Sequence, residues 1–165
     1  GFRKGEILGL EWDDIDFEHN IINIDKSYQR IGQEDIITAP KTPKSIRTIA
    51  IFPHLAEVLF AYKEITYSCD NYACDNTNHT KRIFPHTKHF FIHEMKRICQ
   101  KANVKQIRVH DIRHSHVSLL IELGFSPLLI AERLGHENIE TTLNTYSHLY
   151  PNKQTELAGK LQEIF

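Results

Sequence analysis

Short apolar runs separated by turn-forming residues fill the first third of the chain, a pattern typical of short β-strands. The predicted strands cover residues 21–24, 35–38 and 46–51, and Tyr28 lies near the end of the first. Residues 29–33 include Gly32 and predict a turn, and the two prolines within residues 40–43 predict a tight connection before the third strand. We therefore expect a small antiparallel sheet of three strands near the N-terminus.

After Pro53 the apolar residues recur at helical spacing. The predicted helical segments cover the end of a helix at 3–10, a segment after Pro53, and 87–101, 110–123, 126–135, 138–146 and 153–164, with a loop at 68–80. In the segment 87–101 we expect an inward face made of Phe90, Phe91, Met95 and Ile98. Gly124 and Gly135 end two helices, and Ser126 and Pro127 suit an N-cap and first turn. Because the strands are grouped at the start of a mostly helical chain, the fold class is α+β.

The length of 165 residues suits one domain, which we take as residues 1–165. The chain begins without Met in a helix-like segment, so we expect a piece of a longer protein. Three cysteines are too few, and odd in number, for a disulfide framework, which favours a reducing, cytoplasmic setting.

The net charge of −1 counts against a nucleic-acid binder, because such domains are usually basic. The average hides clusters, however. One contains Lys41, Lys44 and Arg47, and a second lies within residues 96–108. Charge alone therefore excludes no function class here.

The candidate chemistry lies mainly in the C-terminal half. His110 and Arg113 are three residues apart on a predicted helix and share a face. Arg113 offers a planar fork of donors suited to phosphate. His136 follows Gly135 just past a helix end, and Tyr146 follows one short helix later. Taken singly, each residue has an ordinary explanation, such as an ion pair of Arg113 with Asp111 or Glu132.

The ordered set of motifs resembles the phage-integrase type of tyrosine recombinase over residues 1 to about 148. Gly1-Phe2-Arg3-Lys4-Gly5-Glu6, followed by Leu-x-Trp-x-Asp-Ile-Asp, is similar to the first arginine box of that family. Lys41 before the strand at 46–51 resembles its hairpin lysine. His110-Asp-Ile-Arg113-His114, Leu-Gly-His136 and the Tyr146 segment follow in the family's order.

This resemblance implies the catalytic domain of a site-specific recombinase, whose N-terminal DNA-binding domains are absent from this chain. Tyr146 would attack a scissile phosphate and form a 3′-phosphotyrosine. Arg3 and Arg113 would bind the non-bridging oxygens, and His136 would donate a further hydrogen bond. Lys41 would protonate the leaving 5′-oxygen, and His110 would help to accept or relay the tyrosine proton. No ATP, metal or other cofactor is implied.

Supporting roles follow for four further residues. Glu6, one turn after Arg3, would hold an arginine or a histidine in place, and His114 would contact a catalytic residue rather than the DNA itself. Lys44 and Arg47 are expected to contact DNA. Lys44 also remains a second choice for the catalytic lysine, because it too precedes the strand.

The expected partner is double-stranded DNA at attachment sites of a phage or mobile element. The resemblance implies a tetramer on DNA, a monomer when free, and an excisionase-type accessory protein. The segment 153–164 can pack in its own domain or on a neighbouring copy. Three other functions remain open: a chromosome-dimer-resolving recombinase of the same chemistry, a DNA-binding module without catalysis, and a zinc hydrolase built on the His110 helix.

Two zinc sites are weaker alternatives. His110 and His114 have the spacing of a two-histidine zinc face, but the usual glutamate between them is absent and Arg113 would repel a cation. Cys69 and Cys74, with a later histidine, have loosely zinc-like spacing in the predicted loop. We expect no metal at either place.

Overall fold

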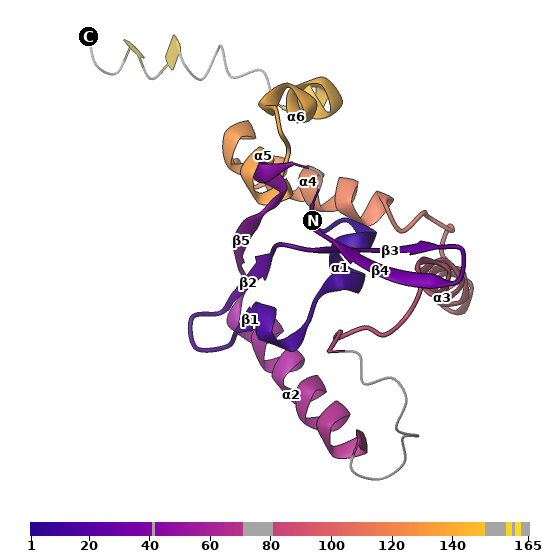
Figure 1. Cartoon of the computed structure of the whole chain (residues 1–165). Helices are drawn as coiled ribbons and strands as arrows, with labels where there is room; N and C mark the ends of the chain where they lie inside the picture. Colours follow the sequence, from indigo (N-terminus) through magenta and orange to yellow (C-terminus); the bar gives the residue numbers. More distant parts are fainter. Residues whose placement is uncertain (41, 71–80, 151–157, 160, 163–165) are drawn as a thin grey trace.

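The structure is a computed structural model, and it describes residues 1–40, 42–70, 81–150, 158–159 and 161–162. The α-helices are α1 (Lys4–Gly9), α2 (Pro53–Asp70), α3 (Lys88–Lys101), α4 (Asp111–Glu122), α5 (Pro127–Leu134) and α6 (Ile139–Tyr146). The strands are β1 (Ile15–Asp16), β2 (Ile21–Ile24), β3 (Ser27–Ile31), β4 (Glu34–Thr38) and β5 (Arg47–Ala50), and short 3-10 helices cover Trp12–Asp14, Pro43–Ser45 and Ser147–Leu149. The α+β class is confirmed: strands are confined to the first part of a mostly helical chain (Figure 1).

The strands form two separate sheets, whereas one was expected. The three-stranded antiparallel sheet has the order β1-β2-β5, and β3 pairs only with β4 as a hairpin. The strand predicted at 35–38 therefore exists but pairs with residues 27–31, most of which were expected to form a turn. The turn is shorter, and Gly32 occupies it with a positive φ of 63°. Asp25 and Lys26 interrupt the run between β2 and β3, so the chain leaves one sheet before starting the other.

Two apolar clusters make the core. One packs the three-stranded sheet against α2, with Ile22, Ile24 and Ile49 at its centre. The other joins α4, α5 and α6 through Val117, Ile130 and Tyr146, among others. The helix α1 and the C-terminal end of α5 lie between these halves, and the polar site described below is built there.

Close packing of α1 on β3 fixes the N-terminal segment. A Cβ added at Gly5 would collide with the Ser27 hydroxyl, and one at Gly9 would lie 3.1 Å from the Tyr28 backbone nitrogen. Only glycine permits this approach without a shift. As a result, Arg3 at the start of α1 is held at a defined place relative to the hairpin.

The hairpin β3–β4 is anchored by a buried aromatic ring. Tyr28 is completely buried, and its hydroxyl donates to Asp35 Oδ1 at 2.8 Å. The Arg82 guanidinium lies 4.5 Å from the centre of the Tyr28 ring and forms an ion pair with Asp35 at 3.3 Å. These contacts hold the hairpin that leads to residues 40–42.

The face predicted for the helix at 87–101 is partly wrong. Phe90 is 39% and Ile98 is 52% exposed, while Cys99 is buried and Phe91 and Met95 are half-buried. Apolar residues occur on more than one face of this helix, so the sequence alone does not show which face is turned to the core. The stripe Phe91, Met95 and Cys99, at intervals of four residues, is the one that faces inward.

The predicted ends of the later helices are confirmed. Ser126 caps α5, and its hydroxyl accepts a hydrogen bond from the Leu129 backbone nitrogen at 3.3 Å. Gly135 ends the same helix in the left-handed region, and Gly124 follows α4 with a φ of 82°. The predicted last helix at 153–164 lies almost wholly outside the described residues.

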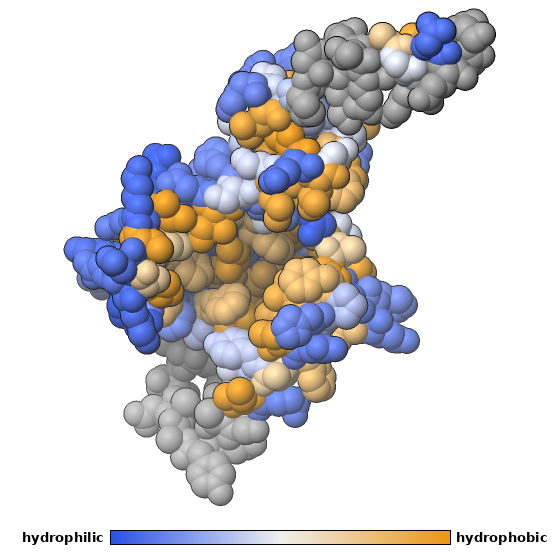
Figure 2. All heavy atoms as spheres, turned by 180° about the vertical axis from the view of Figure 1, so that it is seen from behind, coloured by the Kyte–Doolittle hydropathy of each residue, from blue (hydrophilic) through white to orange (hydrophobic). Residues whose placement is uncertain are grey.

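Apolar side chains are also found on the surface. Seen from behind, they gather around a hollow (Figure 2). A pocket of about 580 Å³ between β5, α4 and α5 is lined by Phe52, Leu120, Phe125 and Leu129, with His116 and Arg133 beside them. Within the described part of the chain, no helix combines the length and the apolar character that crossing a membrane requires.

Candidate active site

Glu6 is the centre of a buried polar network. Its carboxylate accepts hydrogen bonds from the Arg3 backbone nitrogen at 2.7 Å and from Arg3 Nη1 at 2.8 Å. It also pairs with Arg47, whose Nη2 lies 2.9 Å and Nη1 3.1 Å from its two oxygens. Burial by itself would raise the pKa of Glu6, but the hydrogen bonds from Arg47 and Arg3 outweigh it and lower that pKa. Glu6 is therefore ionised near neutral pH and orients two guanidinium groups.

Arg47 is a framework residue, which corrects the expectation that it contacts DNA. Its side chain is only 7% exposed. Besides Glu6, it donates to the backbone oxygens of Arg133 and Ser45, each at 2.9 Å. Because these partners surround the guanidinium, it joins β5 to α5 and leaves no free face for a phosphate.

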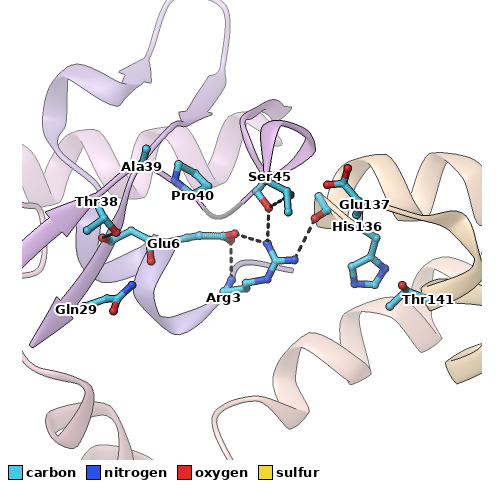
Figure 3. Close-up of a pocket in the computed structure, with 13 residues that line it drawn as sticks. Arg3, Glu6, Gln29, Thr38, Ala39, Pro40, Ser45, His136, Glu137 and Thr141 are labelled. Carbon is cyan, nitrogen blue, oxygen red and sulfur yellow. Dashed lines mark hydrogen bonds and ion pairs between the residues drawn. The ribbon is translucent and has the colours of Figure 1, made fainter.

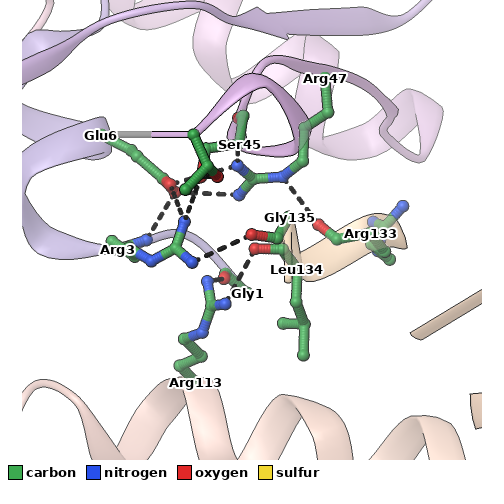
Figure 4. A network of polar contacts seen from close by, with 10 residues as sticks. Gly1, Arg3, Glu6, Ser45, Arg47, Arg113, Arg133, Leu134 and Gly135 are labelled. Carbon is green, nitrogen blue, oxygen red and sulfur yellow. Dashed lines mark hydrogen bonds and ion pairs between the residues drawn. The ribbon is translucent and has the colours of Figure 1, made fainter. Parts of the chain in front are cut away.

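The C-terminal end of α5 brings Arg3 and Arg113 together. Arg3 Nη2 donates to the Gly135 carbonyl at 3.0 Å, and Arg113 Nη2 donates to the neighbouring Leu134 carbonyl at 2.8 Å (Figure 4). Arg113 also donates to the Gly1 carbonyl. Last-turn carbonyls carry partial negative charge and lack partners within the helix, so guanidinium groups bind them readily.

Burial and the nearby Arg3 lower the pKa of Arg113 to about 10, so it stays protonated at neutral pH. The carboxylates considered from the sequence are not its described partners. Asp111 instead accepts from Arg108 Nη2 at 3.0 Å, and Arg113 binds backbone oxygens. Two cations held close together in a partly buried place favour an anion between them.

Gly135 is required where these arginines meet. Its φ of 67° is strained for other residues, and a Cβ there would lie 2.8 Å from Arg47 Nη1. The tight turn places His136 directly after the helix. The Nδ1 atom of His136 lies 2.8 Å from the hydroxyl of Thr142 on α6, and Thr142 is fully buried.

Burial and the charges of Arg113 and Arg3 lower the pKa of His136 to about 4. The ring is therefore neutral at pH 7. When the Thr142 hydroxyl donates to Nδ1, the ring carries its hydrogen on Nε2, which is then a donor. Arg3, Arg113 and His136 thus give a group of donors suited to a phosphate.

Tyr146, at the end of α6, lies against α4. It is 6% exposed, and its hydroxyl lies 2.5 Å from His114 Nδ1. Burial raises the pKa of Tyr146, and the charge of Arg113 offsets part of that increase. His110 meets the His114 ring edge-on, with centroids 4.9 Å apart, so His114 stands between His110 and the tyrosine.

A pocket of about 390 Å³ opens beside Arg3 and His136 (Figure 3). Pro40 and Thr42, the neighbours of position 41, line it. Lys41 itself lies outside the described residues. Lys44 is exposed and donates to the Glu137 carbonyl at 2.8 Å, so it lies close to the pocket without entering the arginine network.

Sequence reasoning missed three members of this site. Thr142 and Ser45 are ordinary hydroxyl residues with no local signature, although both are buried and bind site residues. Arg47 was expected to contact DNA because it belongs to a basic cluster in the sequence, so its role inside the network was not predicted. The alternation of β5 around buried Ile49 was the available signal for its inward direction, since Arg47 and Ile49 are two residues apart.

Metal binding gains no support from the described part of the chain. There, no three His, Cys, Asp or Glu side chains are grouped closely enough to hold an ion. The His110 ring contacts the His114 ring, and the His114 ring contacts Tyr146. The side chains of Cys69 and Cys74 lie outside the described residues, and Cys99 is a free, buried thiol.

Comparison with known proteins gives concordant matches. The family model described as "Phage integrase family" matches residues 1–153. The chain is 40% identical over 169 residues to the ICEBs1 integrase of Bacillus subtilis (strain 168), covering 99% of this chain and 46% of that protein. It is 29% identical over 179 residues to the integrase of Staphylococcus phage L54a, covering 99% and 49%. The chain thus spans about half the length of these curated relatives.

Among solved structures, the Tn1549 transposon integrase in complex with transposon right end DNA has the same fold. The TM-score is 0.77 at 22% identity, over 99% of this chain and 54% of that one. This likeness concerns the arrangement of helices and strands described above.

Proposed function

The chain belongs to the phage integrase family, and we propose that it is the catalytic domain of a site-specific recombinase that cuts and rejoins DNA. One observation carries the proposal. Arg3, Arg113 and His136 converge on the end of α5, while α6 runs from that end to a hydrogen-bonded Tyr146. A tyrosine close enough to feel the charge of Arg113, on the helix that follows the Arg3 and His136 site, suits attack on a phosphodiester.

The reaction follows from these groups. The Tyr146 oxygen attacks the scissile phosphorus, a 3′-phosphotyrosine bond forms, and the 5′-oxygen leaves. Arg3 and Arg113 bind the non-bridging oxygens, whose charge grows in the transition state. His136 donates through Nε2, and Lys41 protonates the leaving oxygen. A 5′-hydroxyl then reverses the same steps and restores the DNA backbone.

This chemistry needs no ATP, because the phosphotyrosine conserves the energy of the broken phosphodiester. The group of cations and donors supplies the charge stabilisation for which other phosphoryl-transfer enzymes use metal ions. Glu6 keeps Arg3 oriented, and His110 relays the proton that leaves the tyrosine. Lys44, exposed near the pocket, is proposed to contact the DNA backbone.

Integration and excision of a phage or mobile element is the role that the relatives favour, since they include integrases of ICEBs1 and phage L54a. The DNA is double-stranded and contains attachment sites. We propose a tetramer on DNA, a monomer when free, and an excisionase-type partner. We propose a cytoplasmic location, because the expected substrate is cellular DNA.

A non-catalytic DNA-binding module is the alternative, and the covalent adduct separates the two. The full-length protein should form a protein–DNA adduct that survives denaturing electrophoresis when mixed with nicked duplexes from the DNA flanking its gene. If these duplexes are bound but no adduct forms, the binding module is the better description.

Thr142→Val should slow adduct formation roughly tenfold, because a neutral hydrogen bond contributes about 0.5–1.5 kcal/mol and 1.36 kcal/mol corresponds to a factor of ten. The valine keeps the shape of the buried side chain but no longer fixes the His136 tautomer. Nitrogen NMR of the His136 ring should report the mixed tautomers. Thr145→Val is the matched control, because Thr145 is exposed on the same helix and its hydroxyl donates to the Thr141 carbonyl. Equal losses in both variants would contradict the assigned role of Thr142.

A further inference from the structure

The tyrosine hydroxyl has a defined hydrogen-bond partner within the chain. Tyr146 is 6% exposed, and His114 Nδ1 lies 2.5 Å from its oxygen. The two rings are tilted by 54°, with centroids 5.7 Å apart. A distance this short places the imidazole nitrogen where it can receive a proton directly from the phenol.

The position of His114 on α4 explains the contact. His110, Arg113 and His114 are spaced so that they share one face, and this face is turned to α6. Arg113 points to the end of α5, and His114, one residue later, points to Tyr146. His110 contacts the His114 ring, so His110 is one step further from the phenol.

The charges around the pair favour transfer only when the phenol attacks. Burial raises the pKa of Tyr146, so the hydroxyl keeps its proton at rest. The groups facing this place are His110, Asp111 and Arg113 on α4, Lys4 on α1 and Tyr146 on α6. Arg113 stabilises a phenolate, and burial and the charges of His114 and Arg113 lower the pKa of His110. A neutral His110 therefore adds no repelling charge when His114 becomes protonated.

We propose that His114 is the general base of strand cleavage. As the bond from Tyr146 to phosphorus forms and the bond to the 5′-oxygen breaks, the phenolic proton moves to His114 Nδ1. Lys41 supplies a separate proton to the leaving oxygen. In rejoining, the protonated His114 returns its proton to the departing tyrosine. This inference rests on the proposed recombinase function and names the group that activates its nucleophile.

A merely structural hydrogen bond is the competing explanation, because His114 can also hold the tyrosine in its rotamer. His114→Asn separates the two, since the asparagine oxygen lies close to the position of Nδ1 and accepts the same bond but cannot take up a proton at neutral pH. His93→Asn, the same substitution at an exposed histidine of α3 outside the site, is the matched control.

The experiment measures the single-turnover rate of adduct formation by the full-length protein on nicked duplexes across a range of pH. We expect His114→Asn to be slower by about 10²–10⁴-fold at neutral pH. Its rate should rise continuously with pH as the phenol itself ionises, while DNA affinity is unchanged. His93→Asn should keep both the rate and the pH profile of the wild type.

A second substrate with sulfur at the 5′-bridging position tests the assignment of the two protons. A thiolate leaves without protonation, so Lys41→Ala should recover on this substrate and His114→Asn should not. A wild-type pH profile in His114→Asn, or its rescue by sulfur, overturns the inference. If His114→Asn does not fold, His114→Gln is measured in the same way and judged by the same profile. No adduct in the wild type overturns the recombinase function instead, so the two failures are distinguishable.

Discussion

Tyr146→Phe is expected to abolish the covalent protein–DNA adduct, because phenylalanine has no oxygen to bond to phosphorus. The ring remains in the apolar cluster of α4, α5 and α6, so the fold is kept. Loss of the hydroxyl removes the hydrogen bond to His114, which costs about 0.5–1.5 kcal/mol of stability. Binding of the nicked duplex should be almost unchanged, since Arg3, Arg113 and His136 are untouched.

Tyr150→Phe is the matched control for this variant. Tyr150 packs against the same cluster, and its buried hydroxyl has no hydrogen-bond partner among the described residues. Its removal should leave adduct formation at the wild-type level and stability equal or higher, because an unsatisfied buried hydroxyl is unfavourable. An adduct that persists in Tyr146→Phe, or one that disappears in Tyr150→Phe, would assign the nucleophile to a different residue.

Glu6→Gln is expected to lower the free energy of unfolding by about 3–5 kcal/mol, the range for a buried ion pair that loses one partner. Glu6 is 3% exposed and pairs with both Arg3 and Arg47. The amide keeps the size of the side chain but turns an N–H₂ group toward guanidinium donors. Arg47, 7% exposed, is left without a counter-charge. Urea unfolding measures the loss, and adduct formation should fall as well because Arg3 is released.

The pH dependence of that loss has a definite sign. The pKa of Glu6 in the folded chain is lowered from its ordinary value of 4.5. A depressed carboxyl pKa contributes stability above the unfolded value, and this contribution disappears as the pH falls through the lower, folded value. The difference between wild type and Glu6→Gln should therefore shrink below pH 4.5. Glu122→Gln, at an exposed position of α4, should change neither quantity. A difference that stays constant into acid would show that the charge of Glu6 is not responsible.

Local signals in the sequence predicted the helices well. Ser126 and Pro127 start α5, and Gly135 ends it, because capping and left-handed backbone are requirements of single residues. The pairing of strands was predicted less well. Whether residues 35–38 pair with 27–31 or with 46–51 depends on which partners the rest of the fold brings near. The separation of the two sheets is a long-range property that a short apolar run does not encode.

The site shows the same division. Arg3, Arg113, His136 and Tyr146 were found through motifs, and the structure gathers them around the end of α5 and the face of α4. The contacts that orient them were not found, because they join residues far apart in sequence. The bond between Glu6 and Arg47 spans 41 positions. That between Arg3 and the Gly135 carbonyl spans 132.

The carbonyl groups at the end of α5 bear on the timing of cleavage. They keep Arg3 and Arg113 in position before a phosphate arrives, and each guanidinium has five N–H groups, so further acceptors can be added without a rearrangement. Tyr146, in contrast, is buried at the end of α6, a helix of only eight residues. The groups suited to phosphate binding are thus held at the end of α5, whereas the proposed nucleophile is held at the end of α6. In the proposed recombinase, a displacement of this short helix would withdraw Tyr146 and leave both arginines in place, so that cleavage is controlled separately from phosphate binding.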